Sequence, residues 1–130
     1  MRILIVDDNE RIRRGVMAIL ASRRNWNVCG EARDGMEAIR KARDLLPDLI
    51  LLDVSMPGLN GLEAARLLRK EIANTKILLM SQYDPVPLLP GAIQAGANGC
   101  VDKNRLGTDL LSCIERISGI SEVLGIAIPA

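Results

Sequence analysis

Short apolar runs alternate with amphipathic stretches along this chain, and this alternation limits the possible folds more than any other feature. The apolar runs, rich in Ile, Leu and Val, are Ile3–Val6, Asn27–Gly30, Leu49–Leu52, Ile77–Met80 and Gly99–Val101. Most are continuously apolar rather than alternating with polar residues, which is typical of strands covered on both faces, as in parallel sheets. A chain of 130 residues suits one domain built around one such sheet.

Between these runs, apolar residues recur every three or four positions, which predicts amphipathic helices. The sets that we expect to face the core are Ile12, Val16, Ile19 and Leu20; Met36, Ile39, Ala42 and Leu46; Leu62, Ala65, Leu68 and Ile72; and Leu110, Ile114 and Ile117. Arginines stand opposite the first set, as expected for a helix with one face in water.

Residues that start and stop helices flank these sets. Asp34, Asn60 and Thr108 stand where N-caps are expected, since their side-chain oxygens can accept hydrogen bonds from the free amides of a first turn. Pro47 and Gly119 stand where helices should end. The chain therefore predicts an α/β, doubly wound, five-stranded parallel sheet with helices on both faces. The flavodoxin-like strand order 2-1-3-4-5 is taken from that class of fold and not from the residue pattern.

Composition excludes several classes of function. The chain has no histidine, which rules out Ser–His–Asp and Cys–His catalysis and any histidine-ligated zinc site within it. With 17 basic and 16 acidic residues, it carries no general basic field for nucleic acid. No apolar run approaches the roughly 20 residues that span a bilayer, and the start lacks a signal-peptide pattern. We expect a cytoplasmic protein with no membrane partner and with Cys29, Cys100 and Cys113 as reduced thiols.

Polar residues follow four of the expected strands directly. Asp7 and Asp8 follow the first strand, Asp53 the third, Ser81 the fourth and Lys103 the fifth. The carboxyl ends of parallel strands meet at one edge of the sheet, and ligands bind there in doubly wound folds. We therefore expect three carboxylates, a hydroxyl and an ammonium group to converge.

Crowded carboxylates repel one another and need a neutralising cation. Mg²⁺ is the natural candidate, because it prefers oxygen ligands, and Lys103 adds a second positive charge. A carboxylate can attack phosphorus to form an acyl phosphate, and Asp53 is the best placed nucleophile. Taken singly, each aspartate could equally be a turn former or a helix cap. Residue pattern alone thus predicts an acidic Mg²⁺ site, with phosphoryl chemistry as one use of it.

Four segments of the chain form a distinctive set: Met1–Asn9 (MRILIVDDN), Glu31–Ile39 (EARDGMEAI), Leu51–Glu63 (LLDVSMPGLNGLE) and Ala95–Lys103 (AGANGCVDK). Together they resemble bacterial two-component response regulator receiver domains, the CheY-like family. Their order and spacing match the family across about residues 1–118, which leaves residues 119–130 as a tail or the start of a linker. The residues of these segments are most similar to the NarL/FixJ/LuxR subgroup.

The resemblance implies a role for each site residue. It implies Asp53 as phospho-acceptor, Asp8 as direct Mg²⁺ ligand, Asp7 as a ligand through water, Ser55 as a backbone-carbonyl ligand, Ser81 as the hydroxyl that follows the phosphoryl group, and Lys103 as the cation on a phosphoryl oxygen. The implied donor is a sensor histidine kinase. The implied output is transcription regulation through a C-terminal helix-turn-helix domain that is not in this sequence, and the family also allows a homodimer.

Two features depart from the family pattern. Cys100 stands three residues before Lys103, where the family carries a rotating aromatic ring that a thiol cannot replace. Pro85, Pro87 and Pro90 crowd the expected start of the fourth helix, and proline inside a helix costs about 3 kcal/mol or more. We expect an extended segment to about Leu89 and a helix only from Pro90 or Gly91 to Ala95.

Two other functions stay open at this point. The departures are compatible with a constitutive interaction module that has the receiver fold but no phosphorylation switch. An aspartyl phosphatase is disfavoured, because Asp7 and Asp8 are adjacent rather than spaced as Asp-x-Asp, and the chain is short for a substrate cap. We expect no enzyme activity beyond help with the domain's own phosphorylation and dephosphorylation.

Overall fold

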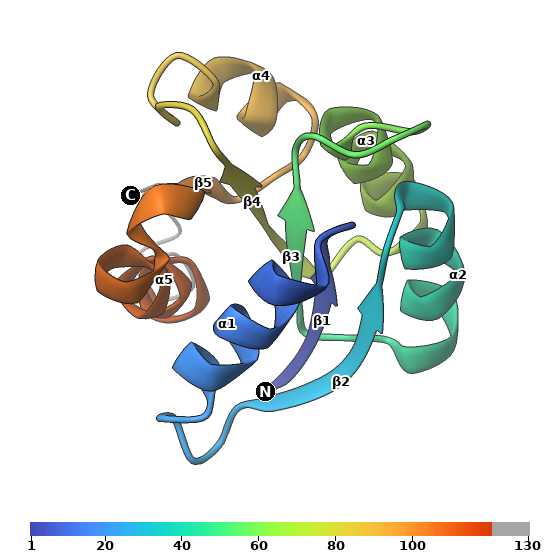
Figure 1. Ribbon diagram of the computed structural model, residues 1–130. Coiled ribbons are helices and arrows are strands. Elements are labelled where there is room, and N and C mark those ends of the chain that lie inside the picture. The colour runs from blue at the N-terminus through green and yellow to red at the C-terminus, as the bar shows by residue number, and fades with distance from the viewer. Residues whose placement is uncertain (121–130) are drawn as a thin grey trace.

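The computed structural model describes the backbone of residues 1–120 and the side chains of residues 1–119. Strands and helices alternate along the chain (Figure 1). The elements are β1 (Arg2–Val6), α1 (Glu10–Leu20), β2 (Asn27–Ala32), α2 (Gly35–Leu45), β3 (Leu49–Asp53), α3 (Gly61–Glu71), β4 (Lys76–Ser81), α4 (Leu89–Gln94), β5 (Gly99–Asp102), a 3₁₀ turn (Lys103–Arg105), α5 (Leu106–Glu115) and a π-helical turn (Arg116–Ile120). Most of the expected tail, residues 121–130, lies outside the described residues.

The sheet has the expected five parallel strands in the order β2-β1-β3-β4-β5. β3 lies at the centre, and all five of its residues are buried. Alternate strand residues point to opposite faces, so the sheet divides the core into two layers. One layer packs against α1 and α5, and the other against α2, α3 and α4 (Figure 1). The doubly wound α/β prediction is confirmed.

Local sequence chemistry explains most helix starts. The Asn9 side chain accepts bonds from two amides of α1, and Asp34 caps α2 as expected. Asn60 and Glu63 form a reciprocal capping box at α3, in which each side chain accepts the other residue's backbone amide. These caps set the direction in which the chain leaves β1, β2 and the loop after β3.

The face predicted for α2 is partly wrong. Ile39 and Ala42 are buried, but Met36 and Leu46 are more than half exposed. Gly35, Ala38, Ile39 and Ala42 form the buried stripe, since the helix packs closely on the sheet and on α3 through small residues. Leu46 lies just past the helix with a positive φ of 47° and points away from the core.

The boundaries predicted for α5 are also wrong, although its inward residues are right. Leu110, Ile114 and Ile117 are buried. The helix begins at Leu106 after a 3₁₀ turn, so Thr108 lies inside it, and its hydroxyl donates to the Arg105 carbonyl instead of capping. Gly119 does not end the helix, because the π-helical turn includes it.

The proline-rich segment before α4 is compact rather than extended. The carbonyl of Pro85 accepts bonds from the amides of Leu88 and Leu89, which closes a turn. This corrects the expected extended conformation, since a proline fixes φ near the value that a turn requires. The helix itself is short, as expected, with Pro90 in its first turn, where a proline is tolerated. No helix within residues 1–120 is both long and apolar enough to cross a membrane.

Candidate functional site

Three carboxylates meet at the carboxyl edge of the sheet. Oxygen atoms of Asp7, Asp8 and Asp53 lie within 4.8 Å of one another. Asp7 and Asp53 are buried, whereas Asp8 is exposed at the mouth of the cluster. The Lys103 ammonium lies between the two buried carboxylates, 2.8 Å from Asp7 Oδ2 and 3.3 Å from Asp53 Oδ1. Segments almost 100 residues apart in sequence thus build one charged site.

Asp53 is held at the end of the central strand by the loop that follows it. The Ser55 amide donates to Asp53 Oδ1 at 3.2 Å, and the Val54 amide continues the ladder to Met80 of β4. The Gly61 amide donates back to the Val54 carbonyl, which closes the loop. A Cβ atom on Gly61 would lie 2.3 Å from the Asp53 carbonyl oxygen, so only glycine allows α3 to start this close to the acceptor strand.

Asp7 is held by three hydrogen bonds and one ion pair. Its amide donates to the Ala32 carbonyl of β2, and its Oδ1 accepts the Asn9 amide at 2.9 Å. Its Oδ2 pairs with Lys103, and its carbonyl accepts from Arg13 Nη1 at 2.7 Å. Asp8 therefore leaves a rigid turn and points its carboxylate into the same cluster as Asp53.

The buried carboxylates alter the acidity of the site. Burial first, and then the charge of Asp7, raise the pKa of Asp53 to about 6, although Lys103 and the Ser55 amide oppose that shift. Burial lowers the pKa of Lys103, but its contacts with Asp7 and Asp53 outweigh burial and leave that pKa raised. Lys103 therefore stays charged, and it compensates only part of the negative charge beside it.

The donor set fits a small divalent cation that prefers oxygen ligands. Two carboxylates are buried, a third is exposed to incoming solvent, and their oxygens are close enough to share one ion. The Ser55 backbone amide donates a hydrogen bond to Asp53, which holds Ser55 beside the same cluster. Burial first, and then repulsion from Asp7, raises the pKa of Asp53, and a bound cation would relieve the repulsion.

Ser81 borders the cluster at the end of β4. It is buried, and its hydroxyl oxygen accepts the Tyr83 amide at 3.1 Å. A groove of about 340 Å³ begins beside it and runs along the β4–α4 segment. The residues that line the groove are Val54, Ser55, Ser81, Tyr83, Asp84, Pro87 and Leu88. The structure thus brings Asp7, Asp8, Asp53 and Lys103 into direct proximity, and Ser55 and Ser81 line one groove.

The family model described as the response regulator receiver domain matches residues 3–115. The chain belongs to the response regulator receiver family. The response regulator GacA of Pseudomonas viridiflava is 37% identical to this receiver domain over 117 residues, which are 90% of this chain and 53% of GacA. The response regulator UvrY of Escherichia coli (strain K12) is 35% identical over 117 residues, which are 90% of this chain and 54% of UvrY.

A solved structure agrees with this assignment. The crystal structure of a two-component response regulator of the LuxR family from Aurantimonas sp. SI85-9A1 matches with a TM-score of 0.86 and 30% identity, covering 99% of this chain and 88% of that one. These likenesses support the NarL/FixJ/LuxR subgroup. The chain spans about half the length of the curated relatives it matches.

In this receiver domain the position of the family's aromatic ring is filled by a buried thiol. Cys100 is fully buried, and burial above all raises its pKa to about 12, so it stays protonated. A pocket of about 230 Å³ lies beside it, lined among others by Asp84, Pro85 and Arg105. A small thiol therefore stands where the family carries an aromatic ring, and open space adjoins it.

Two residues of the receiver site were missed by the reasoning from sequence. Gly61 supports the backbone of Asp53, and Arg13 holds the carbonyl of Asp7. The glycine after the N-cap Asn60 is a signal that could have marked a close approach. Arg13 offered no such signal, because it is one of several arginines on α1 and only the fold distinguishes it from Arg14.

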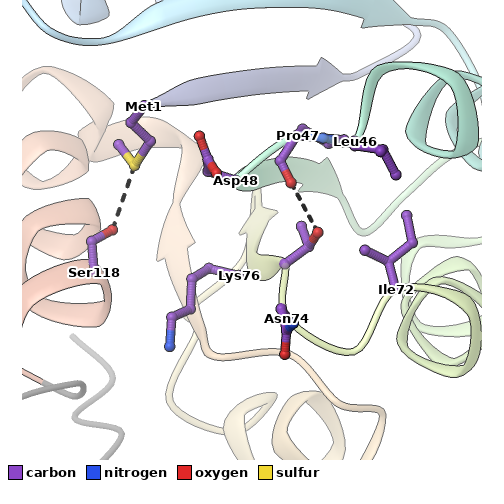
Figure 2. Close-up of a pocket in the computed structure, with 9 residues that line it drawn as sticks. Met1, Leu46, Pro47, Asp48, Ile72, Asn74, Lys76 and Ser118 are labelled. Carbon is purple, nitrogen blue, oxygen red and sulfur yellow. Dashed lines mark hydrogen bonds between the residues drawn. The ribbon is translucent and has the colours of Figure 1, made fainter.

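The opposite end of the sheet carries a pocket of about 310 Å³ without such a charge cluster among its lining residues (Figure 2). The Thr75 hydroxyl donates to the Pro47 carbonyl there, and the Ser118 hydroxyl contacts the Met1 sulfur. Nearby, the Arg69 guanidinium donates to the carbonyls of Gly96, Ile72, Ala73 and Thr75 and to the Asn98 side chain. These bonds tie α3, β4 and the α4–β5 loop together, which is a structural task.

Proposed function

We propose that this receiver domain accepts a phosphoryl group on Asp53 and thereby switches between two conformations. The observation that carries the proposal is the buried Asp53 carboxylate, held beside Lys103 and two further carboxylates at the end of the central strand. Since its pKa is about 6, Asp53 is mostly ionised near pH 7 and can act as a nucleophile.

Asp8, Asp53 and the Ser55 carbonyl would hold Mg²⁺ in this proposal, with Asp7 acting through water. The ion, when bound, would supply positive charge that offsets the repulsion among the carboxylates. The three carboxylates fit that role because one oxygen atom of each lies within 4.8 Å of the others.

The chain's own groups carry the transfer. An Asp53 oxygen forms a bond to the phosphorus of the donor while the bond between that phosphorus and its leaving group breaks, and the leaving group keeps the electron pair. Lys103 then pairs with a phosphoryl oxygen in place of one of its carboxylate contacts. The Ser81 hydroxyl uses its oxygen to accept the Tyr83 amide, so its proton is free to bond a phosphoryl oxygen.

A sensor histidine kinase is the donor that we propose, in keeping with family membership and with the absence of histidine in this chain. We also propose that the output is transcription regulation through a helix-turn-helix domain beyond this sequence. The proposal draws on the likeness to a LuxR-family regulator. Phosphoryl loading would act by binding one of two conformers more tightly than the other.

A constitutive interaction module is the second candidate, motivated by the thiol at position 100 and the short α4. The family match does not favour it. The two functions differ in one measurable respect. Affinity for a kinase or output domain should change on addition of a phosphodonor in a switch and should stay constant in a constitutive module.

The direct test of the proposal is labelling by a small-molecule phosphodonor with Mg²⁺, followed by intact-mass measurement. Wild-type protein should gain one phosphoryl group, and Asp53→Asn should gain none. Asp48→Asn is the matched control, because Asp48 is an aspartate at the other end of the sheet and should leave labelling unchanged. Full labelling of Asp53→Asn would reject Asp53 as the acceptor.

A further inference from the structure

Arg13 lies on α1 but makes its contacts with two neighbouring strand ends. Its Nη1 donates to the Asp7 carbonyl at 2.7 Å, and its Nε donates to Glu31 Oε1 of β2 at 2.8 Å. Only 11% of the side chain is exposed. The neighbouring Arg14 differs sharply, because its side chain is 73% exposed and pairs with Glu10 one turn earlier on the same helix.

The bond to the Asp7 carbonyl acts on the next residue as well. The carbonyl of Asp7 and the amide of Asp8 belong to one planar peptide group, so fixing the carbonyl orients the backbone that leads to Asp8. The other polar atoms of Asp7 are already bound to Ala32, Asn9 and Lys103. Arg13 therefore completes the turn that aims both carboxylates at Asp53.

Glu31 gives the guanidinium a second contact and a compensating charge. A cation beside the carboxylate cluster would oppose the entry of a metal ion, and the ion pair with Glu31 reduces that effect. Lys41 Nζ donates to the Glu31 backbone carbonyl, which anchors the end of β2 to α2. Arg13 is thus held at both ends of its planar fork.

We propose that Arg13 is a positioning residue for the metal centre, acting through the Asp7 carbonyl and not through the ion itself. The inference rests on the proposed function of the carboxylate cluster. Residues that orient metal ligands typically change metal affinity about 10- to 100-fold when they are replaced. Because only one backbone group is held here, we expect the lower part of that range.

Mg²⁺ titration by calorimetry, without phosphodonor, tests the proposal. Arg13→Gln should raise the dissociation constant for Mg²⁺ about 10-fold. Arg13→Lys should fall between Arg13→Gln and wild type, because an ammonium can replace one bond of the fork but not both. Arg14→Gln is the matched control and should stay within about two-fold of wild type, since exposed pairs of this kind contribute little.

A second readout separates positioning from a general loss of structure. The phosphorylation rate of Arg13→Gln should approach the wild-type rate at saturating Mg²⁺ and fall below it at low Mg²⁺. Unchanged Mg²⁺ affinity in a folded Arg13→Gln protein would overturn the proposal, as would a rate that stays low at saturating Mg²⁺. Should Arg13→Gln fail to fold, Glu31→Gln is tested instead, with weaker Mg²⁺ binding expected and unchanged binding overturning the proposal.

Wild-type behaviour distinguishes this inference from the proposed function. If wild-type protein neither bound Mg²⁺ nor accepted a phosphoryl group, the proposed function itself would be refuted. If wild-type protein bound Mg²⁺ and accepted a phosphoryl group, and the Arg13 variants bound Mg²⁺ normally, only the proposed role of Arg13 would be refuted.

Discussion

The two ends of the parallel sheet differ in how their buried polar groups are compensated. At the carboxyl edge, the like charges of Asp7 and Asp53 are buried together and share a single lysine. At the amino edge, Arg69 is also partly buried, and burial lowers its pKa, yet its guanidinium donates hydrogen bonds to backbone carbonyl oxygens and to the Asn98 side-chain oxygen. Repulsion between buried carboxylates therefore remains at the carboxyl edge, whereas the Arg69 guanidinium at the amino edge is satisfied by hydrogen bonds.

This difference indicates how one fold combines reactivity and stability. Buried charges of like sign destabilise a folded protein unless a cation or a proton compensates them. Satisfied buried hydrogen bonds each stabilise it modestly, by about 1 kcal/mol, and removing one partner is costly. Substitutions at the carboxyl edge should therefore separate function from stability, whereas substitutions at the amino edge should change stability alone.

The largest effect is expected from Gly61→Ala at the carboxyl edge. The new Cβ would meet the Asp53 carbonyl oxygen at 2.3 Å and Val54 Cα at 2.6 Å, so the backbone must shift. We expect about 3 kcal/mol of destabilisation in urea unfolding and a marked loss of Asp53 labelling. Gly15→Ala is the control, because Gly15 is exposed in α1 with open space around it and should gain about 0.5–1 kcal/mol. Equal stability of the two variants would contradict this packing argument.

Arg69→Ala should cause the next largest loss of stability, and its effect should be confined to the amino edge of the sheet. Removing the guanidinium leaves several carbonyls near the end of α3 without a donor. We expect about 2–3 kcal/mol lower stability, with the dissociation constant for Mg²⁺ unchanged. Arg66→Ala, at an exposed position on the same helix, should be nearly neutral. A weaker Mg²⁺ complex in Arg69→Ala would mean that the two edges are coupled.

Asp53→Asn should abolish labelling and yet stabilise the metal-free protein. The raised folded-state pKa of Asp53 means that ionising this carboxyl destabilises the fold as pH rises from about 4 to about 6. Asparagine escapes this penalty, so the variant should be more stable than wild type by about 1–2 kcal/mol at pH 7 in EDTA, allowing for solvent screening. The difference should shrink below pH 4. Unfolding curves of both proteins between about pH 3.5 and about 7.5 measure this difference, and a pH-independent difference would refute the raised pKa of the buried Asp53 carboxyl.

Thr75→Val should have the smallest effect. It replaces the hydroxyl that donates to the Pro47 carbonyl at 2.9 Å with a methyl group of similar size. We expect about 1 kcal/mol lower stability, measured by urea unfolding, with labelling of Asp53 unchanged. Loss of labelling in this variant would show that the pocket at the amino edge affects the acceptor site.

Much of this site was predictable because of a general property of parallel sheets. Residues that directly follow buried parallel strands share one edge, so Asp7, Asp8, Asp53 and Lys103 could be grouped without knowledge of any contact. The apolar runs also marked all five strands to within one or two residues of their ends. Ser81 and Ser55 could be placed near the site in the same way, and their roles remain proposals.

Other features could not be read from the chain. The exposed position of Met36 and the internal position of Thr108 depend on how closely α2 packs and where α5 begins. Residues at helical spacing define a stripe, but the neighbouring elements decide which side of it is covered. The turn at Pro85 likewise depends on where the chain must go after β4, which proline chemistry alone does not specify.

The order of apolar and polar residues by itself determined the alternation of strands and helices, the burial of β3 and the set of groups at the sheet's carboxyl edge. Tertiary structure alone decided that Arg13, and not Arg14, holds the Asp7 carbonyl, and that α3 starts against the Asp53 backbone at Gly61. The physical reason is the range of the interactions. Periodicity and capping act within a few residues, whereas a guanidinium fork or a missing Cβ matters only when distant segments come into contact.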